Sequence, residues 1–221
     1  VRSWQGLLFV NLAENPTELE TILAGIPERI APHRLDNMVF YRRVQYYIAC
    51  NWKTYVDNYL EGYHLPLVHP ELCKVLDYRA YVTETYPHYS LQYSPFRSGD
   101  NVYGIADGEA YYYFIFPNIM LNILPGRLQV NCVLPVDNEH CRVLFDYYYD
   151  DIRSPEAQQR IADDITFSDA VQQEDIEICE YVQRGLRSRG YDRGRFSVEC
   201  EEGVYHFQCL LKETYKNALA S

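Results

Sequence analysis

Residues 51–70 read NWKTYVDNYLEGYHLPLVHP, a helical pattern followed closely by two histidines. At about 100° per residue, one apolar stripe recurs along this stretch and predicts an amphipathic helix that begins at Asn51. The stripe consists of Trp52, Tyr55, Val56, Tyr59, Leu60 and Tyr63. Asp57, Glu61 and His64 fall together on the opposite side. By periodicity alone, this polar side is typical of a helix face exposed to water.

The segment that leaves this helix, from His64 to Pro70, is too apolar for an ordinary solvated loop. Pro66 predicts a turn there, because proline cannot continue the preceding helix. The two histidines, His64 and His69, are not spaced by the four residues of a helical zinc motif. The second must therefore come from the loop. With a carboxylate from elsewhere, two such imidazoles form the two-His-one-carboxylate site that binds non-haem iron(II).

A carboxylate can be sought in residues 155–188, which read as one long helix. Its predicted apolar face consists of Ser168, Val171, Ile178, Cys179, Val182 and Leu186. Asp175 lies within that face, and Asp164 lies near it three turns earlier. Three other carboxylates are predicted to point elsewhere, namely Glu174, Glu177 and Glu180. A carboxylate that faces a core needs a partner, which can be a metal cation, an Arg or a set of backbone donors.

Several segments together carry a family resemblance: NWK (51–53), DNY (57–59), EGYH (61–64), HP (69–70) and EDIEICEYVQRGL (174–186). Supporting segments are YYYFIFPN (111–118), FDYY (145–148), YDRGR (191–195) and HF (206–207). From about residue 4 to its end, the chain resembles the catalytic domain of Rieske non-haem iron oxygenase alpha subunits. The similarity is closest to the choline monooxygenase-like branch.

This resemblance implies that His64, His69 and Asp175 hold a mononuclear iron(II) and leave positions open for dioxygen and substrate. Glu61 takes the place of the carboxylate that bridges to the Rieske cluster of a neighbouring subunit. Many ring-hydroxylating members carry Asp there, so Glu61 departs from their pattern. Asn58 matches an amide near the iron in relatives; an ordinary surface Asn is the alternative.

The implied function is hydroxylation of a small organic substrate with dioxygen, with a methylated ammonium compound as the favoured substrate. The implied partners are a reductase or ferredoxin and further copies of the chain, in a trimer. Three alternatives remain open: an aromatic-ring-hydroxylating dioxygenase domain, a ligand-binding module of the same fold without catalysis, and a hydrolase that activates water on the same ligands.

The cysteines do not supply a Rieske 2Fe–2S cluster. That cluster needs Cys-x-His and Cys-x2-His pairs, and none of the seven cysteines has a histidine at either spacing. We expect the cluster to come from a domain absent from this sequence. Residues 1–12 resemble the tail of such a domain, and residues 1–221 are expected to form a single catalytic domain.

Composition narrows the class further. No apolar run approaches the roughly 20 residues that span a membrane. The odd number of scattered cysteines, seven, favours a reduced, cytoplasmic setting over a disulfide framework. The net charge of −11 argues against nucleic acid as a partner and is compatible with a cationic substrate or a basic redox partner.

The expected fold is α+β of the helix-grip type, a curved antiparallel sheet wrapped around the long helix, with the substrate cavity between them. Residues 96–108 are the expected mobile loop. A short helix is expected at 16–24, and a further helix at about 203–218. The strands are expected at residues 6–12, 38–49, 78–86, 89–93, 110–116, 120–124, 128–134 and 142–149.

Tyrosine occurs 22 times, chiefly because it favours strands. A sharper hypothesis is an aromatic box that holds a quaternary ammonium group by cation–π attraction. Tyr111, Tyr112 and Tyr113 cannot all face one cavity, because residues along a strand alternate between the two faces.

Overall fold

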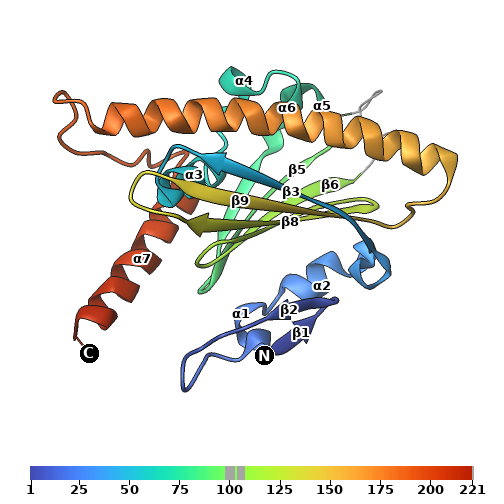
Figure 1. Cartoon of the computed structure of the whole chain (residues 1–221), viewed down its shortest axis with the longest axis horizontal. Helices are drawn as coiled ribbons and strands as arrows, with labels where there is room; N and C mark the ends of the chain where they lie inside the picture. Colours follow the sequence, from blue (N-terminus) through green and yellow to red (C-terminus); the bar gives the residue numbers. More distant parts are fainter. Residues whose placement is uncertain (98–102, 104–107, 221) are drawn as a thin grey trace.

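The computed structural model describes residues 1–97, 103 and 108–220. Its main element is a seven-stranded antiparallel sheet in the order β3-β9-β8-β7-β6-β5-β4 (Figure 1). These strands are β3 (Val39–Ile48), β4 (Val82–Thr85), β5 (Tyr89–Pro95), β6 (Glu109–Ile115), β7 (Ile119–Leu124), β8 (Arg127–Pro135) and β9 (Cys141–Tyr149). Consecutive antiparallel pairings connect β4 to β9, and β3 completes the edge beside β9.

The long helix α6 (Pro155–Leu186) crosses one face of this sheet (Figure 1). Ser154 caps its start by accepting a hydrogen bond from the Ala157 backbone N–H at 3.2 Å, and Pro155 occupies the first turn, where no N–H is needed. The short helices α3 (Trp52–Tyr59), α4 (Leu65–Val68) and α5 (Leu72–Val75) lie on the same side, and α7 (Glu202–Ala220) packs at the end of the sheet. The predicted helix-grip fold is confirmed.

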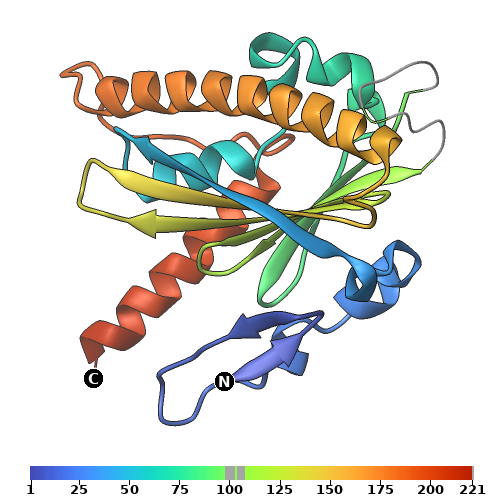
Figure 2. The same ribbon diagram turned by 45° about the vertical axis from the view of Figure 1, so that its right-hand side comes forward.

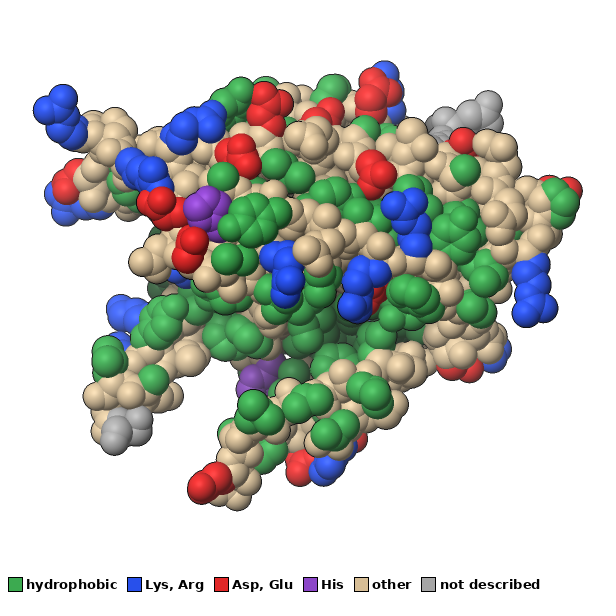
Figure 3. All heavy atoms as spheres, in the orientation of Figure 1, with side chains coloured by type: hydrophobic (Ala, Val, Ile, Leu, Met, Phe, Trp, Pro, Cys, Tyr) green, Lys and Arg blue, Asp and Glu red, His purple; other side chains and the backbone are tan. Residues whose placement is uncertain are grey.

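The opposite face of the sheet carries the N-terminal segment, as the rotated view in Figure 2 also shows. It contains the hairpin β1 (Arg2–Trp4) and β2 (Leu7–Phe9), the helices α1 (Leu19–Ile22) and α2 (Ile26–Ile30), and the 3-10 turns η1 (Ala31–His33) and η2 (Leu35–Asn37). Figure 3 shows the surface hollowed between α7 and this segment, with hydrophobic side chains gathered there. None of the helices within the described ranges is long and apolar enough to cross a membrane.

Strand alternation divides the sheet side chains between two cores. Tyr113, Leu121 and Leu128 pack toward α1 and α2, whereas Phe114 and Met120 pack toward α3, α6 and α7. Tyr112 lies on the α6 side, and its neighbours Tyr111 and Tyr113 belong to the other core. The prediction that these three tyrosines cannot share one cavity is therefore confirmed.

Several expected boundaries were wrong. The strand expected at 6–12 is only the three-residue strand β2, which begins after a turn in which Gln5 and Gly6 have positive φ. The helix expected at 16–24 contains only one regular turn, α1. The strand expected at 78–86 begins with the 3-10 turn η3 (Tyr78–Ala80). The other strands and the two C-terminal helices lie where expected, within a few residues. The loop expected to be mobile lies mostly outside the described residues.

The helix that begins at Asn51 is shorter than its apolar stripe predicts. The Asn51 side chain caps α3 by accepting from the Lys53 backbone N–H at 3.0 Å, but the helix ends at Tyr59. Gly62 follows, where an added Cβ would lie 2.9 Å from the Tyr81 ring. Pro66 does not break a helix. It occupies the first turn of α4, where proline is well tolerated.

Candidate functional site

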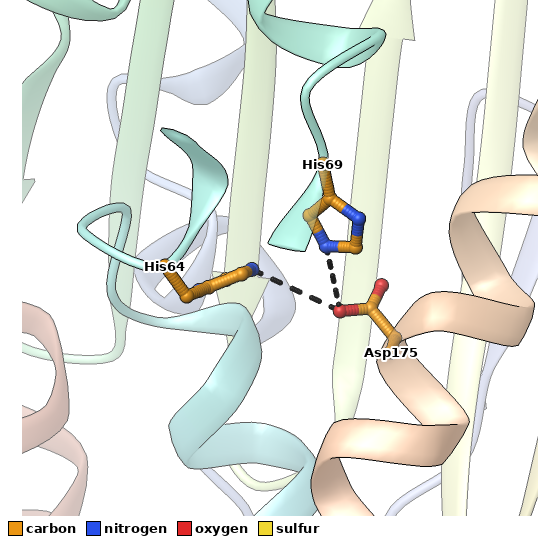
Figure 4. Close-up of side chains that lie close together, drawn as sticks. All are labelled: His64, His69 and Asp175. Carbon is orange, nitrogen blue, oxygen red and sulfur yellow. Dashed lines mark hydrogen bonds and ion pairs between the residues drawn. The ribbon is translucent and has the colours of Figure 1, made fainter. Parts of the chain in front are cut away.

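The structure brings together the three side chains singled out as metal ligands (Figure 4). His64 and His69 are the residues immediately before and after α4, and Asp175 faces them from α6. A single helical turn thus separates the two imidazoles, whose ring centres are 5.0 Å apart. Asp175 Oδ1 is 3.0 Å from His69 Nε2 and 3.8 Å from His64 Nε2. One donor atom from each residue lies within 4.8 Å of the other two.

Each histidine also contacts a carboxylate through its other ring nitrogen. His64 Nδ1 is 2.6 Å from Glu61, which also accepts the His64 backbone N–H. His69 Nδ1 is 2.6 Å from Glu174. A carboxylate at Nδ1 fixes the proton there and leaves the Nε2 lone pair for a cation. The two histidines therefore present Nε2 toward Asp175.

The contact of Glu174 corrects the expectation that this residue points away from the site. Asp175 and Glu174 are adjacent on α6, so their side chains lie about 100° apart around the helix axis. That angle lets Asp175 reach His69 Nε2 while Glu174 reaches Nδ1 of the same ring. In the sequence, only the adjacency of Glu174 to Asp175 indicated that Glu174 lies near the site. An argument that considers only the apolar face of the helix overlooks that adjacency.

Asn58 and Asp175 connect α3 to α6 at the site. Asn58 Nδ2 donates to Asp175 Oδ1 at 2.6 Å. Nearby, Tyr55 donates to Gln172 Oε1 at 2.8 Å, and the Asn51 backbone N–H donates to Gln183 Oε1 at 2.8 Å. These bonds hold the helix that precedes the histidines against the helix that carries Asp175.

Carboxylates outnumber basic side chains around the two histidines. Burial acts to lower the pKa of His69, but hydrogen bonds and charges from Asp175 and Glu174 outweigh it and raise that pKa above the usual value. The same carboxylates that favour a proton on His69 would favour a metal cation in its place.

Asp57, which was expected to share a face with Glu61 and His64, instead accepts two hydrogen bonds from Gln208 on α7.

Asp164 is part of a different contact. Its Oδ2 is 2.7 Å from Arg127 Nε, and it also accepts from the Tyr149 hydroxyl. Asp164 and Arg127 are both buried. Asp164 is therefore half of a buried salt bridge, which settles the choice between the two aspartates in favour of Asp175 as the residue beside the histidines.

Further along α6 the predicted apolar face was partly wrong. Val182 and Leu186 are 45% and 41% exposed. The buried face is made by Ala157, Ile161, Asp164, Ile165, Gln172 and Cys179. The helix extends past the edge of the sheet (Figure 1), so the sheet does not cover the side chains of its final turn.

A cavity of about 130 Å³ opens beside His64, His69 and Asp175, between α6, α3 and the sheet. Aromatic side chains supply much of its wall: Tyr55, Tyr59, Tyr81, Tyr112 and Phe145. Burial raises the pKa of Tyr55, Tyr59 and Tyr81 well above the usual value, so their hydroxyls stay protonated and donate. The predicted cavity between sheet and helix is present, and tyrosines do line it.

The family model for the catalytic domain of ring-hydroxylating alpha subunits matches residues 35–217. Choline monooxygenase of Arabidopsis thaliana is 40% identical over 178 residues, which cover 79% of this chain and 42% of that protein. The carnitine monooxygenase oxygenase subunit of Acinetobacter baumannii is 29% identical over 98% of this chain and 62% of that protein.

Solved structures give the same relationship. A quaternary ammonium Rieske monooxygenase, studied for carnitine oxidation and inter-subunit electron transfer, superposes with a TM-score of 0.85 at 29% identity. That match covers 96% of this chain and 60% of the other. The chain thus spans about half the length of the relatives it matches. It belongs to the family of ring-hydroxylating alpha-subunit catalytic domains, together with the choline and carnitine monooxygenases.

Proposed function

We propose that this chain is the iron-binding domain of a monooxygenase that oxidises a small methylated ammonium compound. The observation that supports the proposal most directly is the group of His64, His69 and Asp175, whose donor atoms lie within 4.8 Å of one another beside an aromatic-lined cavity. The names of the relatives support the substrate class, since they act on choline or carnitine.

The three donors fit iron(II), because two imidazole nitrogens and one carboxylate form its common binding triad. When bound, iron(II) supplies the redox chemistry that activates dioxygen. The chain's own residues orient the donors. Glu61 and Glu174 hold the Nδ1 protons, and Asn58 restrains the Asp175 carboxylate through one hydrogen bond.

The cavity suits a cationic substrate in two ways. Aromatic rings attract a quaternary ammonium by roughly 0.5–2 kcal/mol each. Three carboxylates, Glu61, Glu174 and Asp175, surround the histidines, so the site would keep a net negative charge even with iron(II) bound. An aromatic acid, the substrate type of the ring-hydroxylating alternative, would gain from the rings but not from that charge.

The reaction requires a supply of electrons and protons. Insertion of one oxygen atom of O2 into a C–H bond, with the other released as water, consumes two electrons and two protons. We assign the delivery of the electrons to a Rieske 2Fe–2S cluster of another domain, itself reduced by a reductase or ferredoxin. Glu61, 8% exposed and bound to His64, is the proposed link toward a cluster on a neighbouring subunit of a trimer.

The substrate class can be tested by calorimetric titration of the iron-loaded protein without oxygen. Choline and its uncharged tert-butyl analogue have nearly the same shape. Choline should bind about tenfold tighter, which is the contribution of one or two cation–π contacts. Equal affinity, or tighter binding of benzoate, would establish the ring-hydroxylating alternative instead.

The electron route can be tested separately. With reductase and NAD(P)H alone, this chain should give no sustained product, and an added Rieske domain should restore turnover. In the complete enzyme, Glu61→Gln should lower coupled turnover while iron stays bound. Unchanged turnover in that variant would remove Glu61 from the route.

The expected cytoplasmic location stays a prediction, because the relatives include chloroplastic plant proteins.

A further inference from the structure

Two rows of side chains connect α3 to the C-terminal half of α6, which lie side by side in Figure 1. Each row has three residues spaced by three or four positions, so its members lie on one side of their helix. The row at α3 is Asn51, Tyr55 and Asn58, and the row on α6 is Asp175, Cys179 and Gln183.

Hydrogen bonds join the two rows at both ends. The Asn51 backbone N–H donates to Gln183 Oε1 at 2.8 Å, and Asn58 Nδ2 donates to Asp175 Oδ1 at 2.6 Å. Between them, the middle residues of the two rows are buried in one apolar cluster. The donors are seven positions apart and the acceptors are eight apart. At 1.5 Å per residue these spans are about 10 and 12 Å, so two antiparallel helices can make both bonds at once.

The end of α6 beyond Cys179 is held by polar contacts and not by burial. No side chain in the described part of α6 after Cys179 is buried. Glu180 and Arg187 make contacts there, but both contacts are exposed to water, and exposed ion pairs contribute little. The bond from Gln183 to the Asn51 N–H is partly buried. It is therefore the contact best placed to restrain this end of the helix.

We propose that Gln183 is a positioning residue for the metal site. By accepting the Asn51 N–H, Gln183 fixes how far α6 is displaced along α3. That displacement in turn places the carboxylate of Asp175 against the two histidines. The inference rests on the proposed function, because it takes Asp175 as a metal ligand.

The metal site is sensitive to such a displacement. Metal–ligand distances are fixed to about 0.2 Å, whereas a slip of one residue along a helix moves a side chain by about 1.5 Å and turns it by about 100°. Asp175 Oδ1 is 3.0 Å from His69 Nε2, so a much smaller slip would separate the two donors.

Asn58 and Gln183 restrain the site in different ways. Asn58 binds the Asp175 carboxylate directly, and both partners in that bond are side chains that can change rotamer. Gln183 binds a backbone N–H at the start of α3, whose position the chain itself fixes. Asn58 therefore orients the carboxylate, and Gln183 sets the position of the helix that carries it.

The simpler role for Gln183 is to satisfy the Asn51 N–H and nothing more. In that case its removal would lower stability by about 1 kcal/mol and leave the metal site unchanged. A positioning role predicts in addition that the affinity and the ligand geometry of the site change, although Gln183 is two turns of α6 away from Asp175.

Cobalt(II) is a suitable probe, because its visible absorption reports ligand geometry and its binding is measured without turnover. Gln183→Met keeps the length of the side chain and removes the acceptor. It should weaken cobalt(II) binding about tenfold and shift the absorption bands. Gln183→Glu keeps an acceptor for the Asn51 N–H and should bind cobalt(II) within about twofold of the unmodified protein.

Gln173→Met is the matched control, since it makes the same substitution on the same helix. Gln173 is exposed and closer to Asp175 in sequence, but two positions correspond to about 200° around the helix axis, so it faces away. It should leave affinity and absorption unchanged. Unchanged affinity and absorption in Gln183→Met, with or without lower stability, would overturn the inference, and so would an equal loss in Gln173→Met. If the unmodified protein binds neither cobalt(II) nor iron(II), the proposed function itself fails.

The unmodified protein gives a second test, which does not depend on any variant folding. Coupling between two sites is reciprocal, so a metal ion at Asp175 should strengthen the contact between Gln183 and Asn51. Saturation with cobalt(II) should slow hydrogen exchange of the Asn51 N–H about tenfold. The Ala157 N–H, bonded to Ser154 at the opposite end of α6, should change little. An unchanged rate at Asn51, or equal slowing of both amides, would contradict the proposal.

Discussion

Asp164 and Asp175 lie on the same helix, three turns apart, and face the same side, yet they meet opposite partners. Asp164 faces the β8 end of the sheet, where Arg127 neutralises it at 2.7 Å and Tyr149 adds a hydrogen bond. Asp175 faces α4, where it meets two imidazoles and the Asn58 amide. One carboxylate has its counter-charge within the chain, and the other lies among groups that can bind a metal.

The difference shows what decides between a carboxylate that is paired within the chain and one that is available to a metal. Both positions satisfy the same helical periodicity, so position on the helix does not discriminate. What discriminates between them is the partner that the facing element supplies. Arg127 comes from a strand and the histidines come from a single-turn helix, both remote from α6 in sequence.

The largest effect is expected at Asp175. Asp175→Ala should lower iron affinity by more than about a hundredfold, because a three-ligand site has no spare donor and even outer contacts contribute 10–100-fold. Iron content after anaerobic loading, with circular dichroism to verify folding, measures this.

Asp164→Ala is the matched control for iron binding, since it removes a carboxylate from the same helix face. It should retain iron at the level of the unmodified protein. Full iron retention in Asp175→Ala together with loss in Asp164→Ala would reverse the comparison and make Asp164 the ligand.

For the free energy of unfolding we expect the opposite ranking, with the larger loss at Asp164. Asp164→Ala leaves Arg127 buried without a counter-charge, which typically costs about 3–5 kcal/mol of unfolding free energy. The double variant Asp164→Ala/Arg127→Met should recover a large part of that loss, because neither charge then remains. Urea denaturation at neutral pH measures both, and a double variant no more stable than the single one would contradict the salt-bridge account.

Much of this site was accessible from sequence because its residues are local or periodic. His64 and His69 are separated by one short apolar turn, and Asp175 interrupts an apolar stripe. The strands from β5 to β9 were also predicted by the alternation of their residues. These features depend on neighbours along the chain, which a sequence shows directly.

What the sequence left open depends on contacts across the fold. The partner of Asp164 is on β8, the partner of Asp57 is on α7, and the exposure of Val182 depends on where the sheet ends. The stripe after Asn51 predicted a helix through Tyr63, but the packing of Tyr81 against Gly62 accompanies a turn there. Periodicity cannot register such long-range partners.

Glu174 tests whether a carboxylate that contacts a histidine, and not the metal, also contributes to iron affinity. Glu174→Ala removes the carboxylate at His69 Nδ1 and should lower iron affinity about 10–100-fold, whereas Glu174→Gln keeps an acceptor and should cost less. Glu177→Ala is the control, because Glu177 is exposed on the same helix and accepts from the exposed Tyr181 hydroxyl, away from the histidines. Iron titration that ranks Glu174→Ala equal to Glu177→Ala would remove Glu174 from the site.

Asp57 adds a third, weaker case, a largely buried carboxylate whose hydrogen-bond partner is an amide. Burial raises the pKa of Asp57 to about 7, with Glu201 adding to the rise, while the Gln208 hydrogen bonds and the charge of Lys53 oppose it. The native state therefore holds a proton that the unfolded state releases near pH 4. As pH rises from about 4 to about 7, the unfolded state binds fewer protons, so this group makes stability fall.

Asp57→Asn keeps an acceptor for Gln208 and removes the titration. Its unfolding free energy should exceed that of the unmodified protein by about 1 kcal/mol or more at pH 8, and the gain should shrink toward pH 4. Asp163→Asn is the control, since Asp163 is an exposed carboxylate on α6 that accepts from Gln159 one turn away. Denaturant midpoints at several pH values measure the difference. A gain that is the same at pH 4 and pH 8 would mean that the pKa of Asp57 does not differ between the native and unfolded states, and a loss of stability at pH 8 would mean that the native state favours the Asp57 anion.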